Sequence, residues 1–140
     1  MAEATTGRAL QCVVVTPERA LLDQTVDFVV LPMYDGELGV LPGRAPLIGR
    51  LGYGELRIKR GERTDRFFVD GGFAQVRANV VTVLTPRAQP AENIDTQAAS
   101  QVLQPTAGAT TEARARAEQR ARVQLRIARR ARGEPMAASH

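Results

Sequence analysis

The side chains that could do chemistry are few in this sequence. Cys12 is the only cysteine and His140 the only histidine, so an internal disulfide, a cysteine-based metal site and a histidine-dependent base are excluded. No Ser, Asp or Glu lies in a recognisable nucleophile motif, and the glycines match no phosphate-binding loop. We therefore predict no catalytic residue, no metal site and no cofactor, and expect a function that is mechanical or steric.

Charge is the second chemical resource of the chain, and it is unevenly distributed. Residues 112–132 carry eight Arg against Glu112 and Glu118, a local balance of +6, whereas residues 1–111 carry 11 basic and 12 acidic side chains. An acidic partner should therefore bind the C-terminal segment. No stretch approaches the ~20 apolar residues that a membrane span needs, which predicts a soluble protein.

The elements that hold these charges change character along the chain. From Leu10 to Thr85, short β-branched runs separated by Gly and Pro predict at least seven antiparallel strands, with Gly61 and Asn79 at hairpin tips. So many strands do not fit a flat open sheet in a segment of this length. We expect an antiparallel β sandwich or flattened barrel.

Two local patterns within this region carry specific expectations. The segment from Glu55 to Lys59 alternates polar and apolar residues, which directs Leu56 and Ile58 inward and leaves the three charged side chains in water. The segment Asp70-Gly71-Gly72 predicts a turn between two strands, because glycine tolerates positive φ.

After Pro86 the composition favours helices. A helix of about three turns is predicted from Ala91 to Leu103, with Asn93 or Asp95 available to cap its start. The segment from Gln104 to Thr111 contains Pro and Gly, which break the helix.

A second helix is predicted from Thr111, acting as N-cap, to Arg132, with Gly133 as C-cap. The chain is thus expected to be an α+β protein. A β-sandwich domain over residues 1–87 precedes a helical hairpin over residues 88–140, whose last residues, 134–140, are expected to be frayed.

On a helical wheel, this second helix is amphipathic. A buried Leu stabilises by ~2 to 3 kcal/mol and an Ala methyl by roughly a third of that, so a mostly alanine arc predicts weak, reversible docking. The apolar arc contains Ala113, Ala117, Ala121, Leu125, Ile127 and Ala128, and the polar arc contains Arg116, Arg122, Arg126, Arg129 and Arg130.

Three stretches of the β region form a recognisable set. They are Val14-Val15-Thr16-Pro17-Glu18, then Gly36-Glu37-Leu38-Gly39-Val40-Leu41-Pro42-Gly43-Arg44-Ala45-Pro46-Leu47, and finally Asp70-Gly71-Gly72-Phe73-Ala74-Gln75-Val76 followed by Asn79-Val80-Val81-Thr82-Val83-Leu84. In this order and spacing the chain resembles the epsilon subunit of bacterial and organellar ATP synthases.

The resemblance implies a fold and a set of partners. The family has an N-terminal β sandwich that binds the gamma subunit on one side and rests on the ring of membrane c subunits. Its two C-terminal helices can swing toward the alpha/beta catalytic head and obstruct ATP hydrolysis. A member would be a non-catalytic rotor subunit, peripheral to the membrane, on the cytoplasmic face of the inner (plasma) membrane.

The resemblance also implies site residues. The residues that match the loop facing the c ring are Gly36, Glu37, Arg44 and Leu47, where Arg44 replaces the histidine usual in the family and cannot titrate. In the second helix, the arginines expected to attract the acidic head are Arg122, Arg126, Arg129 and Arg130.

Two further possibilities concern other ligands. Some family members bind ATP on the helical hairpin, but Ala98 occupies the position of an expected arginine although Ile94-Asp95 is present, so no ATP binding is predicted. Outside the family, the alternative is a β-sandwich adaptor whose basic helical tail binds an acidic partner or nucleic acid. Against nucleic acid, the β region offers no aromatic stacking platform and no excess positive charge.

Overall fold

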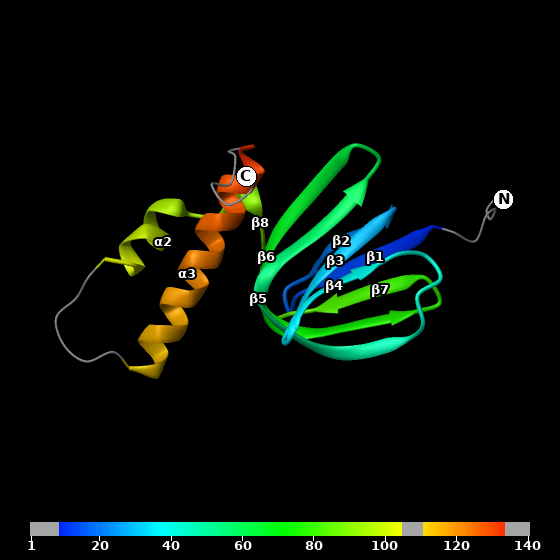
Figure 1. Cartoon of the computed structure of the whole chain (residues 1–140), viewed down its shortest axis with the longest axis horizontal. Coiled ribbons are helices and arrows are strands. Elements are labelled where there is room, and N and C mark those ends of the chain that lie inside the picture. Colours follow the sequence, from blue (N-terminus) through cyan, green and yellow to red (C-terminus); the bar gives the residue numbers. More distant parts are fainter. Residues whose placement is uncertain (1–8, 105–110, 134–140) are drawn as a thin grey trace.

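The computed structural model describes residues 9–104 and 111–133, and in this part of the chain eight strands form one sheet. The sheet curls over into two facing layers that enclose the core (Figure 1). Its strands follow the order β2-β1-β7-β6-β5-β3-β4, and β8 pairs with β6. The strands are β1 (Leu10–Val15), β2 (Ala20–Val26), β3 (Phe28–Met33), β4 (Gly36–Val40), β5 (Leu47–Arg60), β6 (Arg63–Arg77), β7 (Val80–Leu84) and β8 (Ala88–Pro90).

The predicted antiparallel β sandwich is confirmed, with two additions. The pair of β1 and β7 is parallel, while the other strand pairs are antiparallel. Strand β2 was not among the predicted strands. It lies at the edge of the sheet, where an unpaired rim favours polar side chains such as Asp23 and Gln24 over a clear apolar pattern.

The predicted turn at Asp70-Gly71-Gly72 is wrong, because β6 continues through these residues. The strand pairs with β8 before the glycines and with β7 after them. Gly71 and Gly72 have φ of +80° and +109°, and a Cβ on Gly72 would lie 2.1 Å from the carbonyl oxygen of Leu84. The glycines therefore let one long strand bend from one layer to the other.

The predicted hairpin tips are confirmed. Ala78 and Asn79 adopt φ of 53° and 64° between β6 and β7, as a two-residue turn with left-handed central residues requires. Gly61, with φ of +59°, turns the chain between β5 and β6.

The first predicted helix is shorter than expected. Ala91–Asn93 forms a 3-10 turn, η1, and only Thr96–Val102 forms α2. The start of α2 is fixed by Asp95, whose Oδ1 accepts a hydrogen bond of 2.9 Å from the backbone N–H of Ala98. Of the two predicted caps, Asp95 is the one used. An N-cap needs an extended backbone, so the helix begins after Asp95 and not at Ala91.

The second predicted helix is confirmed as α3 (Glu112–Ala131). The hydroxyl of Thr111 accepts a hydrogen bond of 3.0 Å from the N–H of Arg114, and Gly133 has φ of +78° after the helix. The expected frayed tail at 134–140, which includes His140, and residues 105–110 of the predicted break from Gln104 to Thr111 lie outside the described residues.

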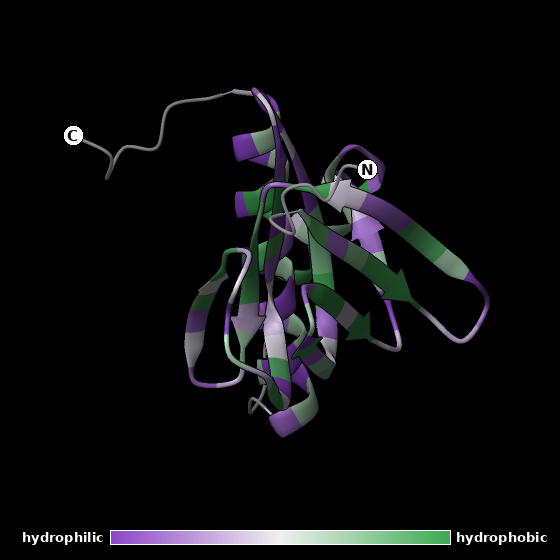
Figure 2. Cartoon of the chain, turned by 90° about the vertical axis from the view of Figure 1, so that its right-hand side faces the viewer, coloured by the Kyte–Doolittle hydropathy of each residue, from purple (hydrophilic) through white to green (hydrophobic). Residues whose placement is uncertain are grey.

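Two apolar clusters divide the molecule. The larger lies inside the sandwich, and Figure 2 shows hydrophobic segments, in green, on the strands around it. It includes Val29, Leu56 and Val81, and no residue of α3 belongs to it. The smaller cluster joins α3 to the outside of β6 through Phe68. The sandwich therefore has a core of its own. Within the described residues, no helix is both long and apolar enough to cross a membrane.

Candidate functional site

The residues of the predicted c-ring loop belong to successive parts of the chain. Gly36 and Glu37 begin β4, Arg44 lies in the segment between β4 and β5, and Leu47 begins β5. Glu37 is 55% exposed at its side chain, Arg44 is exposed and Leu47 packs partly against the core.

The outer face of the sandwich carries a patch of large apolar side chains. Phe73 in β6 lies directly opposite Arg50 in β5 and Leu84 in β7, and Ile48 is two residues from Arg50, so these side chains share one face. Ile48 is 71% exposed, Phe73 53% and Leu84 51%. We call Ile48, Phe73 and Leu84 the outer apolar patch. Exposed apolar residues gathered on one face indicate a protein interaction site.

The helix α3 rests on the sheet through an apolar contact. Val123, Ile127 and Ala128 pack with Phe68 and Ile94. The predicted apolar arc is only partly correct, because Val123 is buried and was not predicted, while Ala113 is exposed. The i, i+4 pair of Val123 and Ile127 is the sequence signal that identifies this face.

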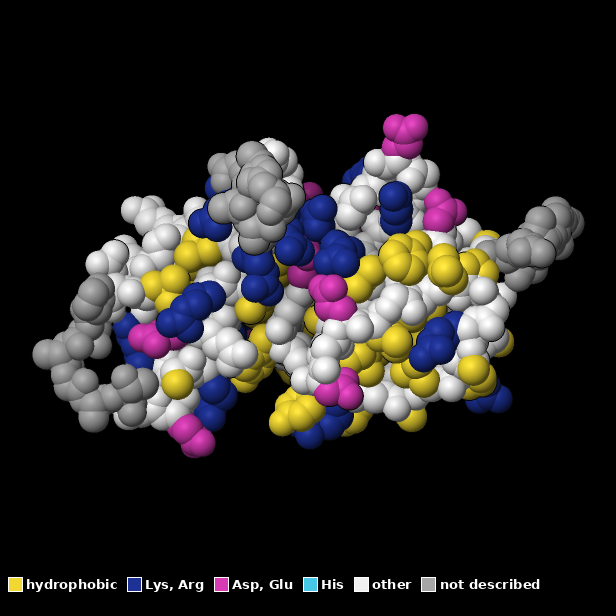
Figure 3. Space-filling model, viewed as in Figure 1, with side chains coloured by type: hydrophobic (Ala, Val, Ile, Leu, Met, Phe, Trp, Pro, Cys, Tyr) yellow, Lys and Arg dark blue, Asp and Glu magenta, His cyan; other side chains and the backbone are white. Residues whose placement is uncertain are grey.

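Four arginines of α3 were predicted to form one exposed face, and three of them do. Arg122, Arg126 and Arg129 are exposed. Arg130 instead points to the sandwich, where its Nη1 donates a hydrogen bond of 2.6 Å to Oε1 of Glu55. Figure 3 shows Arg side chains gathered where the helical part meets the sandwich.

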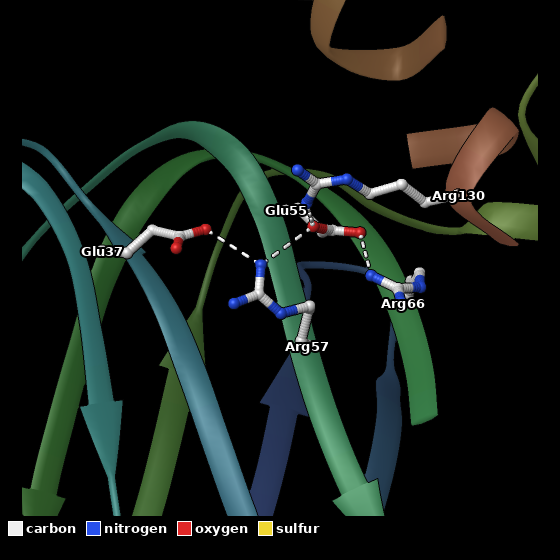
Figure 4. A network of polar contacts seen from close by, with 5 residues as sticks. All are labelled: Glu37, Glu55, Arg57, Arg66 and Arg130. Carbon is white, nitrogen blue, oxygen red and sulfur yellow. Dashed lines mark hydrogen bonds and ion pairs between the residues drawn. The ribbon is translucent and has the colours of Figure 1, made fainter. Parts of the chain in front are cut away.

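Glu55 is the residue that the sequence interpretation misplaced. Its side chain was expected in water, but it is only 2% exposed because α3 covers this part of β5. Nη1 of Arg66 donates to its Oε2 at 2.8 Å, and Nη1 of Arg57 donates to its Oε1 at 3.1 Å. Together with Arg130, these groups surround one buried carboxylate with three guanidinium groups (Figure 4).

The charge state of Glu55 follows from two opposing effects. Burial alone would raise the pKa of the carboxyl, because a charged group loses hydration. The hydrogen bonds from Arg66 and Arg57, and the charges of Arg66 and Arg130, outweigh burial and lower the pKa below its ordinary value. Glu55 is therefore an anion at neutral pH, and its charge holds α3.

A second polar contact holds the middle of α3. Nε of Arg120 donates to Oδ1 of Asp70 at 3.1 Å, and its Nη2 donates to the hydroxyl of Tyr53 at 3.2 Å. The guanidinium also lies over the Tyr53 ring, 4.7 Å from the centroid. Such a cation–π contact contributes about 0.5 to 2 kcal/mol. Arg120 was not among the predicted site residues.

No metal site emerges, since the described residues contain no group of three or more His, Cys, Asp or Glu side chains able to hold a metal ion. Asp95, which matches part of the ATP-binding motif, already caps α2.

We predict that Glu55→Gln lowers the free energy of unfolding by about 3 kcal/mol at pH 7, because it leaves three guanidinium groups without their shared anion. The native pKa is lowered, so the ionised group stabilises the fold above its unfolded pKa of ~4.3 and this stabilisation is lost as the pH falls through the native pKa. Denaturant titrations should show that the difference in free energy of unfolding between the variant and the wild type is smaller at low pH than at pH 7. Glu18→Gln, an exposed control, should stay within ~0.5 kcal/mol; equal effects of the two variants would contradict the role of Glu55.

Comparisons with known proteins agree with this architecture. The family model described as "ATP synthase, Delta/Epsilon chain, beta-sandwich domain" matches residues 9–91. An ATP synthase epsilon chain of Rhodopirellula baltica is 59% identical over 95 residues, which cover 68% of this chain and 74% of the relative. An epsilon chain of Nitratidesulfovibrio vulgaris is 45% identical over 92 residues, which cover 66% of this chain and 69% of the relative.

Solved structures extend the similarity to the helical part. A chain of the mitochondrial ATP synthase of Euglena gracilis, in an assembly of OSCP, F1 and c-ring, gives a TM-score of 0.66 at 25% identity and covers 95% of this chain and 82% of that one. A chain of the mitochondrial ATP synthase central stalk and c-ring of Tetrahymena thermophila shares the fold, with a TM-score of 0.60 at 16% identity. The match covers 87% of this chain and 95% of that one. Because the family model spans more than half of the sequence, the chain belongs to the epsilon chains of ATP synthase, which are non-catalytic stalk subunits.

Proposed function

We propose that this chain is a rotor subunit that joins the gamma subunit to the c ring of an ATP synthase, and that α3 inhibits ATP hydrolysis when it leaves the sandwich. The observation that carries the proposal is the division of the molecule into a sandwich with its own core and a helix held on the outside by a small contact. Family membership sets aside the alternative of a generic adaptor for nucleic acid. Through the complex the chain is peripheral to the membrane, and we propose the cytoplasmic face.

The outer apolar patch is our proposed surface for gamma. A rotor subunit must transmit torque, which requires a stable, well-packed interface, and interface hot spots are enriched in large side chains that become fully desolvated. Phe73 lies at the centre of the patch, between Arg50 and Leu84.

We predict that Phe73→Asp weakens binding of the isolated chain to purified gamma by about 2 kcal/mol or more, measured by calorimetry. The side chain is half exposed, so the variant should fold normally by circular dichroism. Thr64→Asp changes an exposed residue of the same strand outside the patch and serves as the control. Unchanged affinity of the Phe73 variant would place gamma on another surface.

The proposed c-ring contact consists of Gly36, Glu37, Arg44 and Leu47. Both charged residues are exposed, Glu37 on β4 and Arg44 in the segment that follows it. Such a contact places an anion and a cation at two defined positions, which suits a partner of complementary charge.

We predict that charge reversal by Glu37→Arg together with Arg44→Glu lowers ATP-driven proton pumping relative to ATP hydrolysis in vesicles that contain the whole complex, because like charges then oppose the ring. Each single reversal should give a smaller loss. Glu18→Arg, an exposed change outside the proposed contact, controls for altered net charge. Full coupling in the double variant would remove this surface from the proposed ring contact.

We predict that a chain ending at residue 104 assembles normally and raises the rate of ATP hydrolysis by the complex, while ATP synthesis persists. Replacing Arg122, Arg126 and Arg129 with Gln should reproduce part of this rise, because these exposed arginines are the proposed attraction to the acidic head. Arg130 is left unchanged, since it binds Glu55 in the docked state. The matched control replaces three arginines of the sandwich, Arg19, Arg63 and Arg87, with Gln. Failure of the truncated chain to assemble, or an unchanged rate of hydrolysis, would show that α3 is not a brake.

A further inference from the structure

Glu55 would keep cationic partners if α3 left the sandwich. Of its three cationic partners, Arg57 and Arg66 belong to strands of the sandwich and only Arg130 belongs to the helix. When α3 leaves, the buried carboxylate keeps two partners. Removing the last partner of a buried charge is strongly destabilising, so this arrangement makes undocking possible without leaving an unpaired anion in the sheet.

Arg57 contacts two carboxylates through the same nitrogen. Its Nη1 lies 3.1 Å from Oε2 of Glu37 and 3.1 Å from Oε1 of Glu55. Oε1 of Glu55 is also the atom that accepts from Arg130. Arg57 and Arg130 therefore share one oxygen, while Glu37 and Glu55 share one nitrogen, so the charge that each group offers to the next depends on the others.

The two ends of this chain of contacts differ in accessibility. Glu37 is half exposed and open to a partner, whereas Glu55 lies beneath the helix. Figure 4 shows Glu37, Arg57, Glu55 and Arg130 in a continuous line of dashed contacts from β4 to α3. A change at the exposed end alters the balance at the buried end because the shared atoms are few.

We propose that Arg57 couples Glu37 to the docking of α3, so that a basic side chain of a partner bound at Glu37 releases the helix. The basic group forms an ion pair with Glu37, so Glu37 no longer binds Arg57. Arg57 then binds only Oε1 of Glu55 and neutralises more of its charge. The attraction of Glu55 for Arg130 therefore falls. The inference rests on the proposed ring contact of Glu37 and the proposed release of α3, and it adds that the first controls the second.

The coupling must act in both directions. Because two binding equilibria that share a network change each other by the same factor, departure of α3 strengthens the hold of Glu55 on Arg57. The contact between Glu37 and Arg57 then weakens, so Glu37 binds the basic partner more tightly. A sandwich seated on its partner and a released helix are therefore mutually favoured states.

The test measures undocking in the isolated full-length chain, so it does not depend on whether the ring contact is correctly placed. Val123→Cys puts a thiol on the buried face of α3, and its rate of modification by a neutral thiol reagent reports the undocked population. The native Cys12 does not interfere, because burial and the charge of Asp23 raise the pKa of its thiol to about 12.

In this background, Glu37→Gln mimics a neutralised Glu37 and should raise the modification rate about fivefold, at the lower end of typical coupling factors. Arg130→Gln should raise it further, since it removes the docking pair itself. Glu18→Gln is an exposed control and should leave the rate unchanged. An unchanged rate in the Glu37 variant overturns the proposal.

A second background separates a relay through Arg57 from a direct field effect of Glu37. With Arg57→Gln present, the additional change Glu37→Gln should have no effect on the rate. A full fivefold effect in this background would also overturn the proposal. If the Arg57 variant fails to fold by circular dichroism, Arg57→Lys replaces it, because a single ammonium cannot bridge both carboxylates as the guanidinium does, and the effect of Glu37→Gln should then fall well below fivefold.

Discussion

The burial of one carboxylate, Glu55, is the constraint on which the contact between sheet and helix depends. A charge removed from water must be compensated by close, hydrogen-bonded partners, and here three guanidinium groups from β5, β6 and α3 provide them. Two of these partners belong to the sheet itself. The sheet can therefore hold the anion alone, and the helix adds the third partner only when it is docked.

The apolar contact under α3 fits the same division of roles. Val123, Ile127 and Ala128 cover Phe68, while the main core lies entirely within the sandwich. A fully buried Val, Ile or Phe side chain stabilises by about 1.5 to 3 kcal/mol, so this contact fixes the docked position of the helix. Arg120, bound to Asp70 and Tyr53, contributes a second polar anchor. These contacts define the docked position of α3 that the proposed release would have to break.

The sequence predicted those features that depend on local geometry. The turn at Asn79, the cap at Thr111 and the C-terminal Gly133 each follow from neighbouring residues. Glu55 was misplaced because alternation along a strand assumes that one face is wet, and the residue that buries it, Arg130, lies 75 positions away. The glycines at 71 and 72 were misread because positive φ serves a strand bend as well as a turn. Local patterns do not show which side chains a distant helix will bury. They also do not show whether a glycine with positive φ forms a turn or a bend within a strand.

The central claim is that α3 must leave the sandwich to inhibit the complex, and a reversible tether tests it most directly. Gln89 and Gln124 are in contact across the sandwich and α3, with Nε2 of Gln124 donating to Oε1 of Gln89 at 3.2 Å. Both can be replaced by Cys and joined with a short reducible cross-linker. The complex that contains the tethered chain should hydrolyse ATP faster than the same complex after reduction. Equal rates before and after reduction would contradict the account.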